Sequence, residues 1–224
     1  MMTGVLLHTG YLTTVWYVVA HGVPAGVSGV IAAVQPILTA LLAPFLLGER
    51  ISRRQWAGII LGFLGILLVL QPKLAAVNRS EISGLTWLFF LNFLGMVSVT
   101  AGTFYQKRFI PSGDLRTVTL WQYVGAAAST WMLAYVFEPN LHIEWAPAAI
   151  ATMAWSVIAL SVGAVLLLLW IIRRGAVSRA ATLIYLVPSV VVIQAYILFG
   201  ETVSPLQILG IAVTAVGVLL AVRK

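Results

Sequence analysis

Long apolar runs separated by short polar breaks dominate the sequence. Each run has roughly 20 residues, which is the length an α-helix needs to cross the hydrocarbon core of a bilayer. The breaks are rich in turn formers, as in Gly22-Val23-Pro24 and Pro111-Ser112-Gly113. The pattern predicts an all-α integral membrane protein, a polytopic helical bundle with eight transmembrane helices. The predicted spans are 3–20, 25–47, 55–71, 84–105, 117–137, 147–172, 177–199 and 205–222.

The composition supports lipid as the main solvent. Only 8% of the 224 residues are charged and 61% are hydrophobic, whereas a soluble domain usually carries about a quarter charged residues. The formal net charge of +7 does not indicate nucleic-acid binding, because the basic residues form short clusters between spans and not a continuous basic face. The chain has no cysteine, so disulfides and thiolate metal sites are excluded.

The basic clusters are distributed unequally between the two membrane sides. Successive spans alternate in direction, so every second connector lies on the same side. One side holds Arg50, Arg53, Arg54, Lys107, Arg108, Arg116, Arg173, Arg174, Arg179, Arg223 and Lys224, and the other holds Lys73 and Arg79. The positive-inside rule predicts that the richer side and the C-terminus are cytoplasmic. We therefore expect a multi-pass protein of the plasma (inner) membrane.

An internal repeat relates the second and third spans to the last two. A shift of 152 positions lays residues 25–70 on residues 177–222 without a gap. The pairs that match are Pro36 with Pro188, Gly48-Glu49 with Gly200-Glu201, Ser52 with Ser204, Gln55 with Gln207, Gly58 with Gly210, and Gly65 with Gly217. In each copy, the Ser and the Gln three residues after it are predicted to form a capping box at the start of a helix. The glycines, with Gly62 and Thr214, are expected to allow close helix packing.

The two copies of the repeat are predicted to be inverted. The connector with Glu49 lies on the basic side of the membrane, and the connector with Glu201 lies on the opposite side. Inverted repeats are typical of secondary transporters. Residues 1–71 then form the last three helices of a first repeat, and residues 84–224 form a complete second repeat of five helices. We therefore expect two further helices before Met1.

These paired motifs resemble the EamA family of the drug/metabolite transporter superfamily. The resemblance rests on the pattern helix, Pro, Gly-Glu turn, capped helix and Gly, which occurs once from Pro36 to Gly65 and again from Pro188 to Gly217. It covers essentially the whole chain, which resembles helices three to ten of that family. The resemblance implies ten helices in two inverted bundles of five, a central cavity, cytoplasmic termini, and the export or uptake of small metabolites.

No catalytic or metal-binding pattern is present. The three histidines are scattered, and the six acidic residues lie in connectors or at helix ends. We expect no enzyme activity, metal or cofactor. His8 lies inside a span but near its cytoplasmic end, where a structural role is favoured over proton relay. Glu49 and Glu201 are expected to anchor their turns and to neutralise a neighbouring helix N-terminus.

Candidate cavity residues are uncharged polar and aromatic side chains within the spans. Gln35 and Tyr185 combine mid-span depth with a nearby proline. The full set is Gln35, Tyr185, Ser189, Asn92, Gln122, Trp16 and Tyr17. Hydrogen bonds between helices explain the amides equally well, and interfacial anchoring is a common role of Trp and Tyr.

The sequence thus predicts a secondary transporter that moves small metabolites or drug-like solutes by alternating access, with export favoured by resemblance. Its partners are a small-molecule substrate and the lipid bilayer, with no nucleic acid. One alternative is a non-transporting truncated membrane scaffold or accessory subunit. Another is a membrane enzyme acting on lipid-linked substrates, which would require a polar catalytic cluster that the sequence lacks.

Overall fold

The computed structural model describes residues 1–77, 84–137, 145–174, 177–200 and 202–222. Over these residues the chain forms eight helical rods, which confirms the predicted all-α architecture. The first four are α1–η1–α2 (Met2–Gly4, Val5–Thr13, Thr14–Ala20), α3–α4 (Ala25–Ala32, Gln35–Leu47), α5 (Arg53–Ala75) and α7 (Thr86–Phe109). The others are α8 (Leu115–Phe137), α9–η2–α10 (Pro147–Trp155, Ser156–Ala164, Val165–Arg174), α11–η3–α12 (Val177–Thr182, Leu183–Tyr185, Leu186–Phe199) and α13 (Pro205–Val222).

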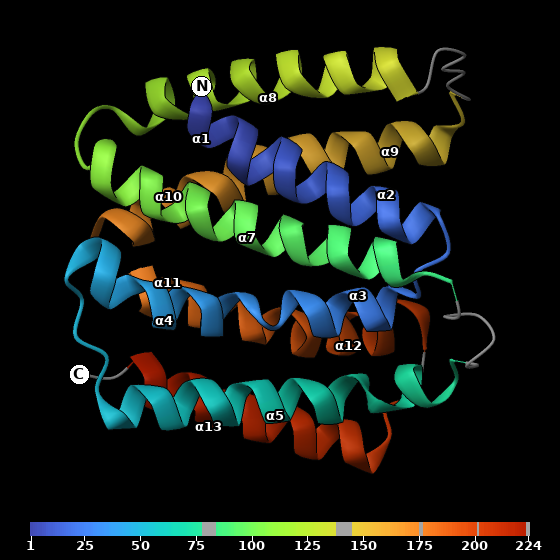
Figure 1. Cartoon of the computed structure of the whole chain (residues 1–224). Coiled ribbons are helices and arrows are strands. Elements are labelled where there is room, and N and C mark those ends of the chain that lie inside the picture. The colour runs from blue at the N-terminus through green and yellow to red at the C-terminus, as the bar shows by residue number, and fades with distance from the viewer. Residues whose placement is uncertain (78–83, 138–144, 175–176, 201, 223–224) are drawn as a thin grey trace.

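The rods lie side by side, and successive rods run in opposite directions (Figure 1). The turn 48–52, the loop 110–114 and the end of α13 lie at one end of the bundle, on the left of the view. The turns 21–24 and 202–204 lie at the other end. The first end also carries the basic residues at the start of α5, the end of α7, the start of α8 and the end of α10, and we call it the basic end. Arg79, Arg223 and Lys224 lie outside the described residues.

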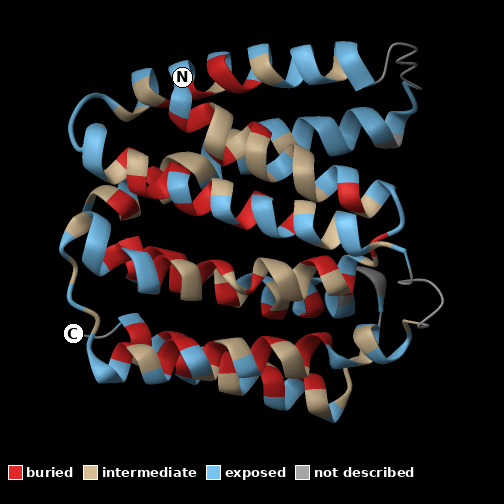
Figure 2. Ribbon diagram, in the orientation of Figure 1, coloured by how far each residue is buried: buried red, intermediate tan, exposed pale blue. Residues whose placement is uncertain are grey.

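Apolar side chains cover the outside of the bundle. Phe45, Trp131 and Tyr135 are 85%, 74% and 80% exposed, and Figure 2 shows exposed residues along the outer helices. Water would be a poor solvent for such a surface, whereas lipid tails match it. By length and hydropathy, five helices among the described residues could cross a membrane, and they are 25–47, 53–75, 86–109, 149–174 and 205–222.

The two predicted capping boxes are present. The Gln55 backbone N–H donates to Ser52 Oγ at 3.2 Å, and the Ser52 backbone N–H donates to Gln55 Oε1 at 2.8 Å. Gln207 and Ser204 repeat the arrangement at 3.2 and 3.0 Å. The preceding glycines, Gly48 and Gly200, have φ values of +67° and +66°, a left-handed conformation that favours glycine. The two copies thus share one local geometry at opposite ends of the bundle. Glu201 lies outside the described residues.

Helices α5 and α13 pack antiparallel with their backbones in contact. A Cβ atom added to Gly58 would lie 2.5 Å from the Gly217 carbonyl oxygen, and one added to Gly210 would lie 2.9 Å from the Gly65 carbonyl oxygen. Such distances leave no room for any side chain. The 152-residue shift converts the first of these contacts into the second. The helix pair therefore lies on a pseudo-twofold axis, which confirms that the repeats are inverted.

We predict that Gly58→Leu destabilises the fold by about 1–3 kcal/mol, because the leucine would force two backbones apart. The measurement is the midpoint of thermal unfolding of the purified protein in detergent. Gly163→Leu is the matched control, since a Cβ at this exposed glycine would have its nearest contact at an ordinary 3.6 Å. Equal midpoints for the two variants would contradict backbone contact between α5 and α13.

Candidate functional site

Two rods are interrupted near their middles, at positions that the repeat makes equivalent. In the second rod, α3 ends at Ala32 and α4 begins at Gln35, with a turn between them. In the seventh rod, the 3₁₀ segment η3 separates α11 from α12. The 152-residue shift lays the turn residue Ala33 on Tyr185, the last residue of η3. Interrupted helices at related positions are a recurrent feature of binding sites in inverted-repeat transporters.

A proline follows each interruption and leaves a backbone carbonyl without its usual partner. Pro36 and Pro188 have no N–H, so neither can donate to the carbonyl four residues earlier. These carbonyls belong to Ala32 and Ile184. The Leu186 backbone N–H donates to the Ile184 carbonyl instead, and a carbonyl oxygen has a second lone pair that can accept a further hydrogen bond.

Residues of both breaks belong to one buried cluster that also contains residues of α5 and α13. Ala33 and Tyr185 belong to this cluster together with Ile59, Ile66 and Val218. Tyr185 is completely buried. Its ring lies against Gly62, where an added Cβ would be 2.5 Å from Tyr185 Cδ2.

Hydroxyl groups without partners lie at the second break. Tyr185 Oη and Ser189 Oγ are both buried and have no hydrogen-bond partner, although a buried polar group in this state costs about 1–3 kcal/mol. At the first break Gln35 is also buried, and its backbone carbonyl accepts a hydrogen bond from Thr39 Oγ1 at 2.9 Å. Gln35, Tyr185 and Ser189 thus lie at the paired breaks, which we call the break site.

Asn92 and Gln122 lie between other helices. Asn92 Nδ2 donates to Ser28 Oγ at 2.8 Å and joins α7 to α3. Gln122 Nε2 donates to Gln106 Oε1 at 2.8 Å and joins α8 to α7. Each amide keeps one buried oxygen without a partner. Both therefore bond neighbouring helices and retain an acceptor.

Trp16 and Tyr17 lie on the outer part of α2. Trp16 is 71% exposed and Tyr17 is 39% exposed. The Tyr17 ring stacks on His21 with centroids 3.9 Å apart. The structure does not bring these two aromatic residues together with the break site.

A second group of interior polar residues was not among the sequence-based candidates. The rings of His8 and Tyr123 stack with centroids 4.8 Å apart, and Tyr123 Oη donates to the Ser161 carbonyl at 2.6 Å. His8 and Ser161 lie in the π-helical segments η1 and η2. Local widening of this kind is frequent at functional sites but leaves no clear sequence signal. Thr3 Oγ1 and Gln106 Nε2 are also buried without a partner, and the polar character of these two residues was the only clue in the sequence.

Glu49 connects the two repeats at the basic end. Its carboxylate accepts from the Val177 backbone N–H at 2.8 Å and from Ser178 Oγ at 2.8 Å. The turn after α4 therefore caps the first turn of α11, where the helix dipole favours negative charge. Behind this contact is a narrow hollow lined by residues that include Gln55 and Thr182, and it has no room for a water molecule.

The break site can bind a solute through uncharged groups. Amide, hydroxyl and backbone carbonyl groups can orient a small solute, and none of the residues of the two breaks is charged. Within the described residues, no group of three or more His, Asp or Glu side chains could hold a metal ion.

Comparisons with known proteins agree with this architecture. The profile of the EamA-like transporter family matches residues 2–71 and 85–223. A "Probable amino-acid metabolite efflux pump" of Salmonella typhimurium is 26% identical over 96% of this chain and 73% of its own length. A "Probable terminal-alkyne amino-acid exporter" of Streptantibioticus cattleyicolor is 25% identical over 90% of this chain and 65% of its own.

A solved crystal structure has the same fold. It superposes with a TM-score of 0.74 and 20% sequence identity, and the match covers 98% of this chain and 74% of that one. The family match spans nearly all of the chain and includes both copies of the Pro, Gly-Glu and capped-helix pattern. The chain therefore belongs to the EamA-like transporter family.

Proposed function

We propose that this membrane transporter moves a small solute by alternating access and binds it at the break site. Residues 1–71 and 84–224 would be the two inverted halves that rock about the α5–α13 axis. The observation that carries the proposal is that two repeat-equivalent helix breaks contribute residues to one buried cluster with α5 and α13, and that hydroxyl groups at the second break lack partners. A solute in that position would contact both halves at once.

The structure corresponds, in this proposal, to a state closed at the basic end. The Glu49 carboxylate holds the start of α11, and the hollow behind it excludes water. Two residues that line the hollow, Ile59 and Ala221, also belong to the cluster around Tyr185. A path from the basic end to the break site would therefore open when Glu49 releases Val177 and Ser178.

The solute is proposed to be an amino acid or an amino-acid derivative. A site without formal charge suits a solute without net charge, such as a zwitterion, because an ion would remain uncompensated in a low-dielectric interior. Backbone carbonyls can accept from an ammonium group, and the Gln35 amide and the Tyr185 and Ser189 hydroxyls can donate to a carboxylate. The names of the two relatives above, both concerning amino-acid compounds, support the same class.

The direction is proposed to be export across the plasma (inner) membrane. The basic end would face the cytoplasm, in agreement with the positive-inside rule. The cytoplasmic solute would enter when the Glu49 contact opens and would leave after that contact forms again.

Transport assays in proteoliposomes with a panel of radiolabelled neutral amino acids test the proposal. Tyr185→Phe retains the ring but removes the hydroxyl, so we expect the KM for a transported solute to rise about tenfold, as for one lost hydrogen bond to a charged group. The matched control is Tyr196→Phe, on the same rod but 59% exposed. Movement of no solute in the panel by the native protein would contradict transport and favour a scaffold. An unchanged KM for Tyr185→Phe would contradict binding at the break site.

Removal of the Glu49 carboxylate is predicted to open the basic end more often. In the cysteine-free chain, Thr182→Cys places a single thiol at a fully buried position behind the Glu49 contact. We expect Glu49→Ala to raise the rate of maleimide labelling at this thiol about tenfold, because the hydrogen bonds of a charged acceptor are lost.

Asp114→Ala is the control for this prediction. Asp114 is a carboxylate at the same end, but it accepts hydrogen bonds only within its own turn, from Thr117. Its removal should leave the labelling rate unchanged. An equal rate in Glu49→Ala and the native background would contradict a gate at Glu49.

A further inference from the structure

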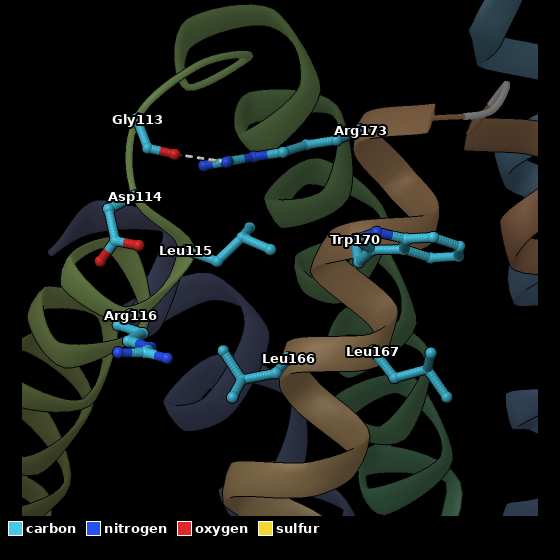
Figure 3. A pocket seen from close by; sticks show the side chains of 8 residues that line it. All are labelled: Gly113, Asp114, Leu115, Arg116, Leu166, Leu167, Trp170 and Arg173. Carbon is cyan, nitrogen blue, oxygen red and sulfur yellow. Dashed lines mark hydrogen bonds between the residues drawn. The ribbon is translucent and has the colours of Figure 1, made fainter.

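An open pocket of about 680 Å³ lies at the basic end, between the start of α8 and the end of α10 (Figure 3). Residues 113–116, which are the end of the loop and the start of α8, form one wall. Leu166, Leu167, Trp170 and Arg173 of α10 form the other. The pocket lies away from the break site and contains none of its residues.

Arg173 extends across the top of this pocket, and one edge of its guanidinium has no hydrogen-bond partner. Its Nη1 donates to the Gly113 carbonyl, which fixes the side chain in place. Its Nε and Nη2 are buried and have no hydrogen-bond partner. These two nitrogens lie on one edge of the guanidinium plane and can donate two parallel hydrogen bonds to a phosphate or carboxylate. Protein atoms cover both nitrogens, so an anion would reach them only after a local displacement of the covering groups. A buried charged donor without an acceptor is unfavourable, which favours that displacement.

The charges that line the pocket sum to a positive value. Arg116 provides a second guanidinium on the loop wall, and Asp114 provides the single carboxylate. Asp114 accepts from the Thr117 backbone N–H at 3.0 Å and from its hydroxyl at 3.2 Å. The hydrogen bond from the Thr117 backbone lowers the pKa of the Asp114 carboxyl, so this group is ionised at neutral pH and is already engaged within its turn.

The rest of the α10 wall is apolar and faces outward. Leu167 is 57% exposed and Trp170 is 44% exposed. Trp170 lies about one turn and Leu167 nearly two turns before Arg173 on α10. Trp is enriched at the membrane–water boundary, which places the guanidinium at headgroup level and the leucines at the level of the acyl chains. A fully water-soluble anion would make no use of this wall.

We infer that the pocket binds an anionic phospholipid from the surrounding bilayer. The phosphate diester accepts two hydrogen bonds from Nε and Nη2 of Arg173 and faces Arg116, while an acyl chain lies along Leu166, Leu167 and Trp170. Basic pockets between transmembrane helices are suited to such headgroups. The bound lipid would tie the loop before α8 to the end of α10.

The test is lipid binding by the whole purified protein in neutral detergent. Phosphatidylglycerol, phosphatidylcholine and inorganic phosphate are titrated separately, and native mass spectrometry and the thermal unfolding midpoint report binding. We expect phosphatidylglycerol to remain bound and to raise the midpoint, and we expect neither of the other two to do so. Equal retention of the two lipids would overturn the proposal. An equal midpoint shift with inorganic phosphate would replace the lipid with a free anion and would also overturn it.

Two variants and a control locate the site. Arg173→Lys keeps the charge but loses the two-nitrogen edge, and it should weaken phosphatidylglycerol binding about tenfold. Arg116→Gln, at an exposed position, should also weaken phosphatidylglycerol binding. It replaces Arg173→Lys as the test if that variant does not fold. Arg54→Gln removes a charge at the same end outside the pocket and should leave binding unchanged. A loss in Arg54→Gln equal to that in the pocket variants would show a diffuse charge effect and would refute a defined site.

Discussion

The contact between the backbones of α5 and α13 is the constraint on which the rest of the structure depends. Glycines at equivalent positions leave no Cβ at the closest approach of the two helices, so each helix lies where a side chain of the other would collide with its backbone. Such an approach is possible in lipid because dispersion and not hydrophobic burial draws apolar helices together. The antiparallel crossing requires α5 and α13 to run in opposite directions. It thereby fixes the two repeats in inverted orientation and places their helix breaks beneath the same pair.

Local physical rules made much of this architecture predictable from the sequence. The apolar run lengths gave the eight rods, and the Ser-x-x-Gln patterns gave the starts of α5 and α13. The paired Gly-Glu turns were visible because a left-handed residue before a capped helix favours glycine in both copies. Pro36 and Pro188 marked the helix breaks for a similarly local reason, the missing N–H. The inversion followed from the alternation of connectors, which needs no knowledge of packing.

Contacts between distant segments could not be read in this way. The partners of Glu49 lie at Val177 and Ser178, and only the folded bundle brings the turn after α4 to the start of α11. The close seating of Gly4 on the backbone of Gln122 and the π-helical segment with His8 depend equally on tertiary packing. The sequence favoured Tyr185 over Trp16 because of its depth and nearby proline, but it could not show that Tyr185 is completely buried and Trp16 is 71% exposed. The pocket lined by Arg173 lies between α8 and α10. In the sequence its residues show only a basic helix end and a loop, so the pocket could not be predicted.

The inverted arrangement can be measured directly, because the cysteine-free chain accepts single labels. Arg50→Cys and Thr202→Cys place one thiol in the turn before α5 and one in the turn before α13. A membrane-impermeant maleimide is applied to intact cells and then to permeabilised cells. We expect the thiol at position 202 to react in intact cells and the thiol at position 50 to react only after permeabilisation. Reaction of both thiols from the same side would contradict the antiparallel crossing of α5 and α13 in the membrane.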